Sequence, residues 1–293
     1  MAEEFSILVD KAFNYDEILQ RQKLNHDDVV ALRKIAKDIP AVPRLIFDKQ
    51  LVLFTCVAGG DINKAASFLQ RFYEIKQSSP ALFGKRDPES KSIQHQMEIQ
   101  EIASLPITQD NCFVFIHRVL DFPPREYNYN VVYRMFMMMA EASIYKDGPR
   151  DGVIFVSDWK NVKFAHLFRP GIKSLKVMLD FLRNANPLPL KAVHVFNASY
   201  LVQVLIAMVR PLMWSELFDM IHVHSGDTDY KDFFHQHIPR SHMPQDYGGD
   251  LPTLKELHEK TAKNLLNMRD YFCLEERHMM HEFDDFKSID QID

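Results

Sequence analysis

Four short apolar runs, separated by stretches of helical length, constrain the fold of this chain most strongly. The runs are 112–121, 152–158, 192–197 and 220–225, and they are rich in β-branched and aromatic residues. Helices are expected between them, over 127–146, 171–184 and 198–219. Short strands that alternate with helices of this length indicate βαβ units, in which the strands are largely parallel and helices pack on the sheet. The runs are apolar almost throughout, as expected when both faces of a sheet are covered.

The first 85 or so residues carry a helical pattern instead. One predicted helix has Asp27 or Asp28 as its N-cap. A second ends at Gly59-Gly60, where a left-handed C-cap is expected because glycine adopts that conformation without strain. A third begins at Asp61, after which apolar residues recur on one face. No strand pattern interrupts these helices, so the sequence predicts an N-terminal helical region.

The residues after Pro252 predict one long helix. Thr253 and Glu256 form a capping box at its start, and apolar residues follow at helical spacing. The acidic end of the chain, 282–293, is expected to fray. We therefore expect a helical region over 1–88, an α/β domain over 89–251, and a C-terminal helix with an acidic tail over 252–293.

Cysteine usage and the N-terminus bear on the compartment in which the chain works. The three cysteines lie far apart and include no CxxC pair, which fits a reducing compartment better than a disulfide framework. The N-terminus begins with acidic residues and has no apolar signal-peptide core. No stretch of about 20 uncharged apolar residues predicts a transmembrane helix. We expect a cytoplasmic protein.

The formal net charge of −5 disfavours nucleic-acid binding by the whole chain. The charge is uneven, however, because residues 159–191 contain seven Lys and Arg residues and only one acidic residue, Asp180. This local excess fits contact with an anionic membrane surface. A solvated helix face that happens to be basic is the alternative.

Motifs for catalysis or a resident cofactor are missing from the sequence. It contains no GxSxG, HExxH, GxGxxG or GxxxxGK[ST] pattern, and we expect no enzymatic activity. The histidines His222, His224, His235, His237 and His242 invite a metal interpretation, because the first two share one face of a strand. The others lie on a separate segment with no fixed third ligand. The sequence therefore predicts no metal site and no cofactor.

The expected helix over 127–146 contains the run "MFMMM" and is apolar on more than one side. Met135 and Met139 share one face, while Phe136 and Ile144 lie on the remaining surface. Such a helix must be covered on both sides. The sheet can cover one side, and either more protein or a ligand must cover the other. Methionine adapts to irregular apolar shapes, so a pocket wall and a buried core helix both remain open.

The segment 198–214 is likewise apolar around most of its circumference. Ser199 is a suitable N-cap, and Pro211 breaks the helix near its end. A helix of this kind is either fully buried, or covers an apolar cavity on one side and meets lipid on the other. A loop and a proline at its ends would let it swing as a lid.

Several motifs resemble the CRAL-TRIO lipid-binding family. "HMPQDYGGDLPTL" resembles the family's L-P-x-x-Y-G-G signature, with Met243 in place of the leucine. "DWKNVKFAHLF" resembles its Asp followed by Phe-x-His-x-Phe, and "NPLPLKAVHVFN" and "MIHVHSGD" resemble its next two strands. The N-terminal helices resemble the region that accompanies this domain. The motifs occur in the family's order over roughly 26–254 and are most similar to the α-tocopherol and retinaldehyde transfer type.

The resemblance implies a monomeric cytosolic carrier with a five-stranded, mostly parallel sheet, flanking helices and a mobile gate helix over 199–220. Its partners would be one hydrophobic small molecule, such as a tocopherol, retinoid or carotenoid, and transiently an anionic membrane. The implied ligand-binding residues are Met135, Met138, Met139, Ile154, Phe155, Phe164, Phe168, Met178, Phe181, Leu182, Leu201, Val204, Leu205 and Met208.

Two departures from the family pattern bear on the ligand and on membranes. Met135 and Met139 stand where the tocopherol carrier has serines, which favours a less polar or differently shaped guest. Lys191 matches one basic position that holds phosphoinositide phosphates, and Lys173, Lys176 and Arg183 would have to supply the others. A phosphatidylinositol or phospholipid exchange protein and an interaction module that loads no lipid are the alternative functions.

Overall fold

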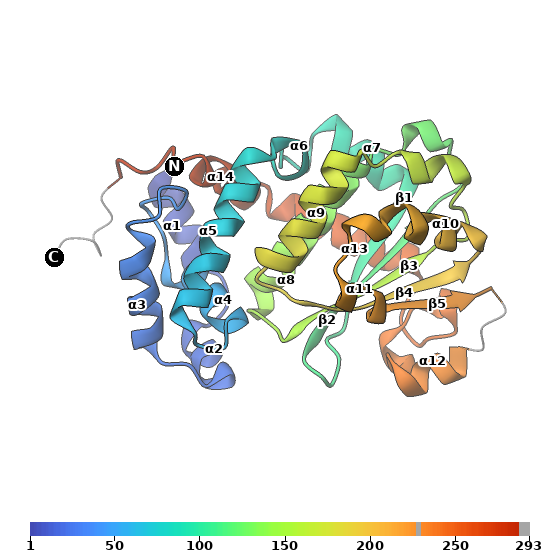
Figure 1. Ribbon diagram of the computed structural model, residues 1–293, viewed down its shortest axis with the longest axis horizontal. Coiled ribbons are helices and arrows are strands. Elements are labelled where there is room, and N and C mark those ends of the chain that lie inside the picture. Colours follow the sequence, from blue (N-terminus) through green and yellow to red (C-terminus); the bar gives the residue numbers. More distant parts are fainter. Residues whose placement is uncertain (227–229, 287–293) are drawn as a thin grey trace.

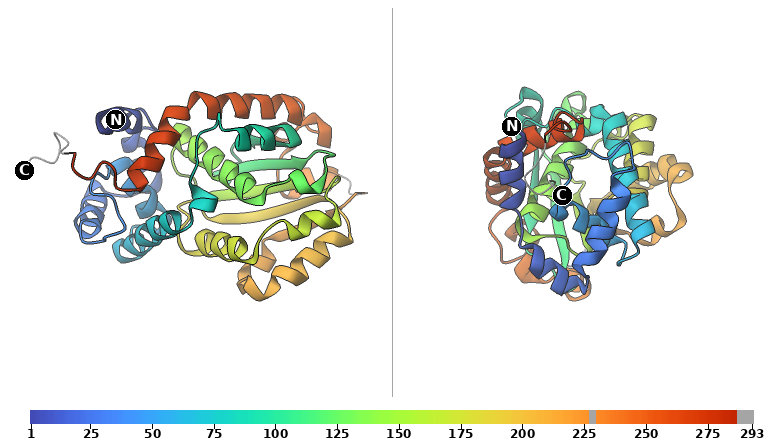
Figure 2. Two further views of the ribbon diagram at one scale, coloured as in Figure 1. Left: turned by 90° about the horizontal axis from the view of Figure 1, so that it is seen from above. Right: turned by 90° about the vertical axis from the view of Figure 1, so that its left-hand side faces the viewer.

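The computed structural model describes residues 1–226 and 230–286, and it has an α/β architecture (Figure 1). Helices pack against both faces of one sheet, and a group of N-terminal helices lies beside this unit (Figures 1 and 2). The predicted fold class is confirmed. Most of the acidic tail that the sequence predicts to fray, 287–293, lies outside the described residues.

The sheet of the described chain has the order β1-β2-β3-β4-β5. Its strands are β1 Gln100–Leu105, β2 Cys112–Val119, β3 Gly152–Asp158, β4 Leu190–Ala198 and β5 Ile221–Ser225. Strands β2 to β5 are parallel and correspond to the four predicted apolar runs, whereas β1 pairs antiparallel with β2. The sequence pattern missed β1 because it is short, begins with Gln100 and Glu101, and follows a helix without a turn signal.

Helix α13 (Leu254–Asn267) covers the outer edge of β1. His258 of this helix accepts a hydrogen bond at Nδ1 from the backbone N–H of Ile102 (3.2 Å), and its Nε2 lies 3.0 Å from the carbonyl oxygen of Met97. The N–H of Ile102 would otherwise be unpaired at the sheet edge, and the carbonyl of Met97 belongs to the last turn of α7. The helix and its histidine therefore protect β1 from pairing with another chain.

Two clusters of buried side chains lie on opposite faces of the sheet. Helices α8 (Tyr129–Asp147) and α9 (Ile172–Asn184) cover the face that carries Phe113 and Phe115, and this cluster continues into the N-terminal helices. Helix α12 (Tyr230–Gln236) and the segment that follows it cover the face that carries Ile116 and Phe196. Because neighbouring residues of a strand point to opposite faces, the face of each strand residue follows from its position in the register.

The N-terminal helices match the predicted helical region, with one correction. They are α1 Ala2–Asp10, α2 Tyr15–Gln22, α3 His26–Ala36, α4 Asp48–Val57, α5 Ile62–Ser78, α6 Pro80–Phe83 and α7 Lys91–Ile99. The N-cap of α3 is Asn25, and Asp28 is its N3 partner, whose carboxylate accepts from the Asn25 N–H (3.0 Å). The predicted N-cap Asp61 is confirmed by its 3.0 Å hydrogen bond from the N–H of Lys64. Gly59 is left-handed, as predicted, with a φ of 64°.

The predicted capping box at Thr253 is confirmed, but the prediction of a single long helix after it is wrong. Helix α13 ends at Asn267, Met268 leaves the helical conformation (φ −97°, ψ 15°), and α14 runs over Arg269–Met279. Helix α14 packs against α1 and α5, where Phe272 is fully buried. No glycine or proline marks this break, so the periodicity alone did not reveal it.

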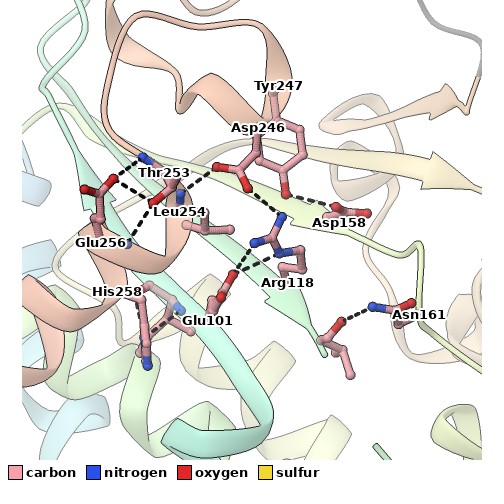
Figure 3. Close-up of polar contacts among 12 residues, drawn as sticks. Glu101, Arg118, Asp158, Asn161, Asp246, Tyr247, Thr253, Leu254, Glu256 and His258 are labelled. Atoms are coloured by element: carbon pink, nitrogen blue, oxygen red, sulfur yellow. Dashed lines mark hydrogen bonds and ion pairs between the residues drawn. The ribbon is translucent and has the colours of Figure 1, made fainter. Parts of the chain in front are cut away.

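The "HMPQDYGGDLPTL" motif contacts the ends of β2 and β3 (Figure 3). Its Tyr247 reaches Asp158 at the end of β3. The buried carboxylate accepts hydrogen bonds from the hydroxyl of Tyr247 (2.9 Å) and the amide of Asn197 (2.7 Å). Arg118 on β2 donates to Glu101 (2.9 Å) and to Asp246 (3.0 Å), and Asp246 accepts from the backbone N–H of Leu254. This network joins the strand ends to the start of α13.

Replacing Tyr247 by phenylalanine is expected to lower the free energy of unfolding by about 2 kcal/mol, because the buried Asp158 carboxylate loses a hydrogen-bond donor. Chemical denaturation monitored by circular dichroism measures the change. Tyr200→Phe is the control, because the Tyr200 side chain is exposed and its loss should change stability by less than about 0.5 kcal/mol. Equal stability of the two variants would contradict a structural role for this hydrogen bond.

Candidate functional site

A cavity of about 190 Å³ opens at the carboxyl ends of β2 and β3. Ligands of open α/β sheets commonly bind beyond this end of parallel strands. Side chains from the two strands, from the segments that follow them and from the first turns of α8 form the wall, and α10 (Tyr200–Val209) contributes one residue. The lining residues are His117, Val119, Tyr127, Tyr129, Phe136, Ser157, Trp159, Val162, His166, Leu167, Pro170 and Leu205.

The polar groups at the cavity wall are largely hydrogen-bonded to one another. The indole N–H of Trp159 donates to the Ser157 hydroxyl (3.1 Å), which lies 3.3 Å from Nδ1 of His117. Nε2 of His117 lies 2.8 Å from the side-chain oxygen of Gln100, so this nitrogen carries the hydrogen. On the opposite side, the hydroxyl of Tyr129 donates to the sulfur of Met178 (2.7 Å). Few polar atoms are therefore left for a guest molecule.

The cavity wall is also uncharged at neutral pH. None of the described residues that line it is Lys, Arg, Asp or Glu. Burial lowers the pKa of His117 to about 4, so its imidazole stays neutral. Burial likewise lowers the pKa of His166 and raises the pKa values of Tyr127 and Tyr129. An uncharged site of this kind favours an apolar molecule.

Helix α10 closes the cavity with Leu205 and exposes its other side. Ser199 caps the helix by accepting from the N–H of Leu201 (3.3 Å), as the sequence predicts. The predicted break at Pro211 is confirmed, because a short 3-10 turn (Arg210–Leu212) and the extended Met213 separate α10 from α11 (Ser215–Asp219). Tyr200 and Met208 on α10 are exposed. The expected helix over 198–219 is thus two helices with a joint.

The methionines of α8 lie in the hydrophobic core rather than around this cavity. Met135, Met138 and Met139 are almost completely buried and belong to the large core cluster. Met139 also borders a separate groove of about 570 Å³ between β1, α8 and α13. Phe136, the neighbour of Met135 on α8, lines the cavity near α10 instead.

The predicted wall residues on β3 and after it point in different directions. Phe155 packs against Phe136 (5.3 Å between ring centroids) on the side of the cavity, whereas Ile154 packs with the cluster under α12. Strand alternation prevents these two neighbours from facing one cavity. Phe164 and Phe168 contact each other but are 51% and 59% exposed. They project toward solvent.

The remaining predicted wall residues lie on α9 and α10. Phe181 packs against Phe72 and Phe83 of the N-terminal helices, and Met178 approaches Tyr129 near the cavity. The other residues differ mainly in exposure: Leu201 is buried, Leu182, Val204 and Leu205 are half-buried, and Met208 is exposed. Of the fourteen predicted residues, Leu205 is the one that lines this cavity.

All four predicted basic residues are exposed. Lys173 and Lys176 lie on α9, close in sequence to the exposed Ile172. Arg183 packs over the ring of Trp214, at the joint between α10 and α11. Lys191 lies beside Gly152, at the amino ends of β3 and β4. These residues therefore lie on different parts of the surface.

Sequence reasoning missed His117, Ser157 and Trp159 as site residues. His117 and Ser157 occupy the carboxyl-terminal parts of two predicted strands and share a face of the sheet. The rule that ligands bind beyond the carboxyl ends of parallel strands could have indicated them. Tyr129 and Phe136 lie in the predicted helix over 127–146, but which of its sides meets the cavity depends on tertiary packing.

The described part of the chain contains no group of three or more His, Cys, Asp or Glu side chains arranged to hold a metal ion. His235 and His242 lie apart from the other histidines named in the sequence, and His235 is exposed. In the same described residues, no helix has the length and apolar character needed to span a bilayer.

The fold and the cavity together define an α/β domain with an uncharged cavity at the carboxyl edge of its parallel strands. Residues 106–249 match the CRAL/TRIO domain family. The chain therefore contains a CRAL/TRIO domain, a lipid-binding domain found in transfer proteins, as its motifs predicted.

Relatives of this chain include proteins named alpha-tocopherol transfer protein-like. The chain is 24% identical to alpha-tocopherol transfer protein-like of Homo sapiens over 237 residues, which cover 80% of this chain and 68% of that protein. It is 24% identical to Clavesin-1 of Rattus norvegicus over 102 residues, 35% of this chain and 28% of that protein. The crystal structure of Sfh5 shares the fold, with a TM-score of 0.53, 10% identity, and coverage of 90% of this chain and 99% of that chain.

Proposed function

We propose that this protein is a non-enzymatic carrier that binds one small hydrophobic lipid in the cavity under α10 and transfers it between membranes. Residues 89–251 would form the carrier unit, with the flanking helices as its support. The observation that carries the proposal is the two-sided character of α10, which presents Leu205 to an uncharged cavity and Met208 to solvent.

The volume of the cavity limits the size of the molecule that can bind in it. A cavity of about 150 Å³ holds one benzene ring. The 190 Å³ under α10 therefore accommodates a ring-sized group, and a longer molecule requires α10 to shift outward. The joint at Pro211 gives the helix a place to bend. We propose a lipid with an apolar or weakly polar ring, such as a tocopherol, retinoid or carotenoid.

Exposed apolar side chains near α10 support contact with a membrane. Phe164, Phe168 and Ile172 lie before and at the start of α9, and Tyr200 and Met208 lie on α10; all five are exposed. Exposed apolar groups beside basic residues such as Lys173 and Lys176 suit an anionic bilayer surface. Inserting these side chains into a bilayer would offset the unfavourable free energy of exposing the cavity when α10 opens.

Identification of the bound molecule tests the proposal most directly. The purified protein, incubated with vesicles that contain tocopherol, retinal or a carotenoid, is examined by native mass spectrometry and solvent extraction. We expect one lipid per chain. Recovery of a phospholipid would favour the phosphatidylinositol or phospholipid exchange alternative, which requires charged headgroup ligands. Failure to load any lipid would favour an interaction module.

Reversing the charge on α9 is expected to slow transfer several-fold. The double variant Lys173→Glu with Lys176→Glu should lower the rate of lipid transfer to vesicles that contain phosphatidylserine, because electrostatic attraction contributes about 1 kcal/mol per basic residue near such a surface. Ligand affinity should not change. Lys34→Glu with Lys64→Glu, at exposed positions of α3 and α5, is the charge-matched control. Transfer as fast as in the wild-type protein would exclude a role for these lysines.

A further inference from the structure

Four histidines gather at the β5 edge of the sheet, on the face away from the cavity. His194 lies on β4, His222 and His224 lie on β5, and His237 follows α12. The ring centroid of His194 lies 4.9 Å from that of His222, 5.3 Å from that of His224, and 4.5 Å from that of His237. His237 also lies 5.3 Å from His222. We name these four residues the histidine cluster.

Strand register and the end of α12 together build the histidine cluster. His194 pairs directly with His222 across the two parallel strands, and His224 lies two residues further along the same face. The backbone N–H of His237 donates to the carbonyl of Phe233 (2.9 Å), which continues the last turn of α12 toward the strands. The ring of Phe233 packs against His194, His224 and His237. The histidine cluster thus forms the contact between β4, β5 and α12.

The geometry of the histidine cluster requires that at least one of its paired imidazoles be neutral. Nδ1 of His194 lies 3.1 Å from Nε2 of His224, so one nitrogen must donate and the other must accept. His194 is only 1% exposed. If both rings were protonated, two N–H donors and two positive charges would face each other in a buried site. The stacked ring of His222 would bring a third charge to the same place.

Among the described residues, no opposite charge compensates the histidine cluster. Burial, together with the neighbouring His237, His222 and His224, lowers the pKa of His194 to about 3, and no carboxylate acts against this shift. Burial and the neighbouring histidines also lower the pKa values of His224 and His237. Of the other charged or titratable side chains described on these elements, Lys191 on β4 and Lys231, Asp232 and His235 on α12 are exposed. Tyr230 on α12 is half-buried, and burial raises its pKa.

We propose that the histidine cluster is a proton-sensitive latch that holds α12 and β5 against β4 at neutral pH and releases them when the pH falls below about 6. Four imidazoles packed together, with no carboxylate of the described residues acting on His194, stabilise this interface while they are neutral and destabilise it once they are protonated. Protonation of the more accessible rings at the edge of the sheet starts the release, because each new positive charge repels the next.

The latch is coupled to the helix that closes the cavity, and this part of the inference rests on the proposed function. Helix α11 ends at Asp219, and β5 begins at Ile221. The carbonyl of Met220 between them accepts a hydrogen bond from the N–H of Val193 on β4 (2.7 Å). Release of β5 from β4 therefore frees the far end of the segment that contains α10. A carrier with this device would unload its lipid at an acidic membrane.

The sign of the pH effect follows from proton binding. The released state binds more protons than the latched one, because His194, His224 and His237 return to a pKa near 6.5. The latched state therefore has its full stability above about pH 7 and loses it as the pH falls through 6.5. For each histidine held neutral, the opening equilibrium rises about 30-fold between pH 7.4 and pH 5.0.

Hydrogen exchange of the intact, lipid-free protein tests the latch without reference to lipid. Protection factors, corrected for the intrinsic pH dependence of exchange, are measured by mass spectrometry at pH 7.4 and 5.0 in the presence of a chelator. We expect amides of β5 and α12 to lose at least 30-fold protection, while β2 and β3 stay protected. The triple variant His222→Gln, His224→Gln, His237→Gln should lose most of this pH dependence. His235→Gln, on the exposed side of α12, should retain it.

The possible results of these measurements either support or contradict the latch. Equal loss of protection in all strands, or the same pH response in the triple variant, would overturn it. If the triple variant does not fold, two measurements replace it: hydrogen exchange of His237→Gln, and titration of the histidine Cε1–H signals of the wild-type protein. Cluster signals that titrate at the ordinary value of about 6.5 would also overturn the latch. Stabilisation by added Zn²⁺ that the chelator abolishes would identify a metal site instead. Acid-induced opening without lipid release would support the latch but contradict its coupling to α10, whereas failure to load any lipid at neutral pH would contradict the proposed carrier function and leave the latch unaffected.

Discussion

Replacing Leu205 by aspartate is expected to abolish lipid loading, with at least a 100-fold loss of affinity for the ligand. Leu205 is the residue of α10 that lines the cavity, whose described wall contains no basic side chain to pair with a new carboxylate. An unpaired charge in such a site is strongly unfavourable. Loading is measured by fluorescence quenching with a polyene lipid and by native mass spectrometry of the purified variant.

Met208→Asp is the matched control on the same helix. The side chain of Met208 is 43% exposed, so a carboxylate there remains hydrated and loading should change less than threefold. The same substitution should slow transfer to vesicles, because it places a negative charge on the surface proposed to meet the bilayer. Normal loading by Leu205→Asp would show that the guest does not occupy the cavity under α10.

Replacing Lys76 by methionine is expected to lower the free energy of unfolding by about 3–5 kcal/mol, because it leaves buried carboxylates without their partner. Lys76 on α5 is 1% exposed, and its Nζ lies 2.8 Å from Glu275 on α14 and 3.1 Å from Glu141 on α8. Arg86 pairs with both glutamates. Chemical denaturation followed by circular dichroism measures the loss.

The four charges of this network work as a unit. Burial lowers the pKa of Lys76 to about 8, although Glu141 beside it acts in the opposite direction. Burial by itself would raise the pKa of Glu141, but Arg86 and Lys76 hold it below its ordinary value. Removing one member therefore leaves an uncompensated charge between the N-terminal helices, α8 and α14.

Two variants separate this electrostatic effect from lost packing. Lys64→Met, at an exposed position of α5, should change stability by less than about 0.5 kcal/mol. Adding Glu275→Gln to Lys76→Met should recover part of the stability, because it removes one of the unpaired carboxylates. A loss below about 1 kcal/mol for Lys76→Met, or no recovery in the double variant, would contradict a coupled buried network.

Local patterns in the sequence predicted most of the elements. The apolar runs at β2 to β5 and the caps at Asp61, Ser199 and Thr253 act through neighbours in the chain, and the structure has them where predicted. Motif likeness likewise indicated the CRAL/TRIO domain. The sequence patterns did not predict strand β1 or the break at Met268, because neither contains a glycine, a proline or a strong periodicity.

The sequence by itself determined strands β2 to β5, most of the helices and several of their caps, because hydrogen bonds, caps and hydrophobic periodicity act over a few residues. Its motifs also indicated the CRAL/TRIO domain. Only the tertiary structure decided which side chains meet. Phe164 faces solvent although the family resemblance implied a place in the pocket wall. His194 meets His222 and His224 through strand register and His237 through the packing of α12. Such contacts depend on how packed elements orient their faces, and residues far apart in the chain set that orientation together.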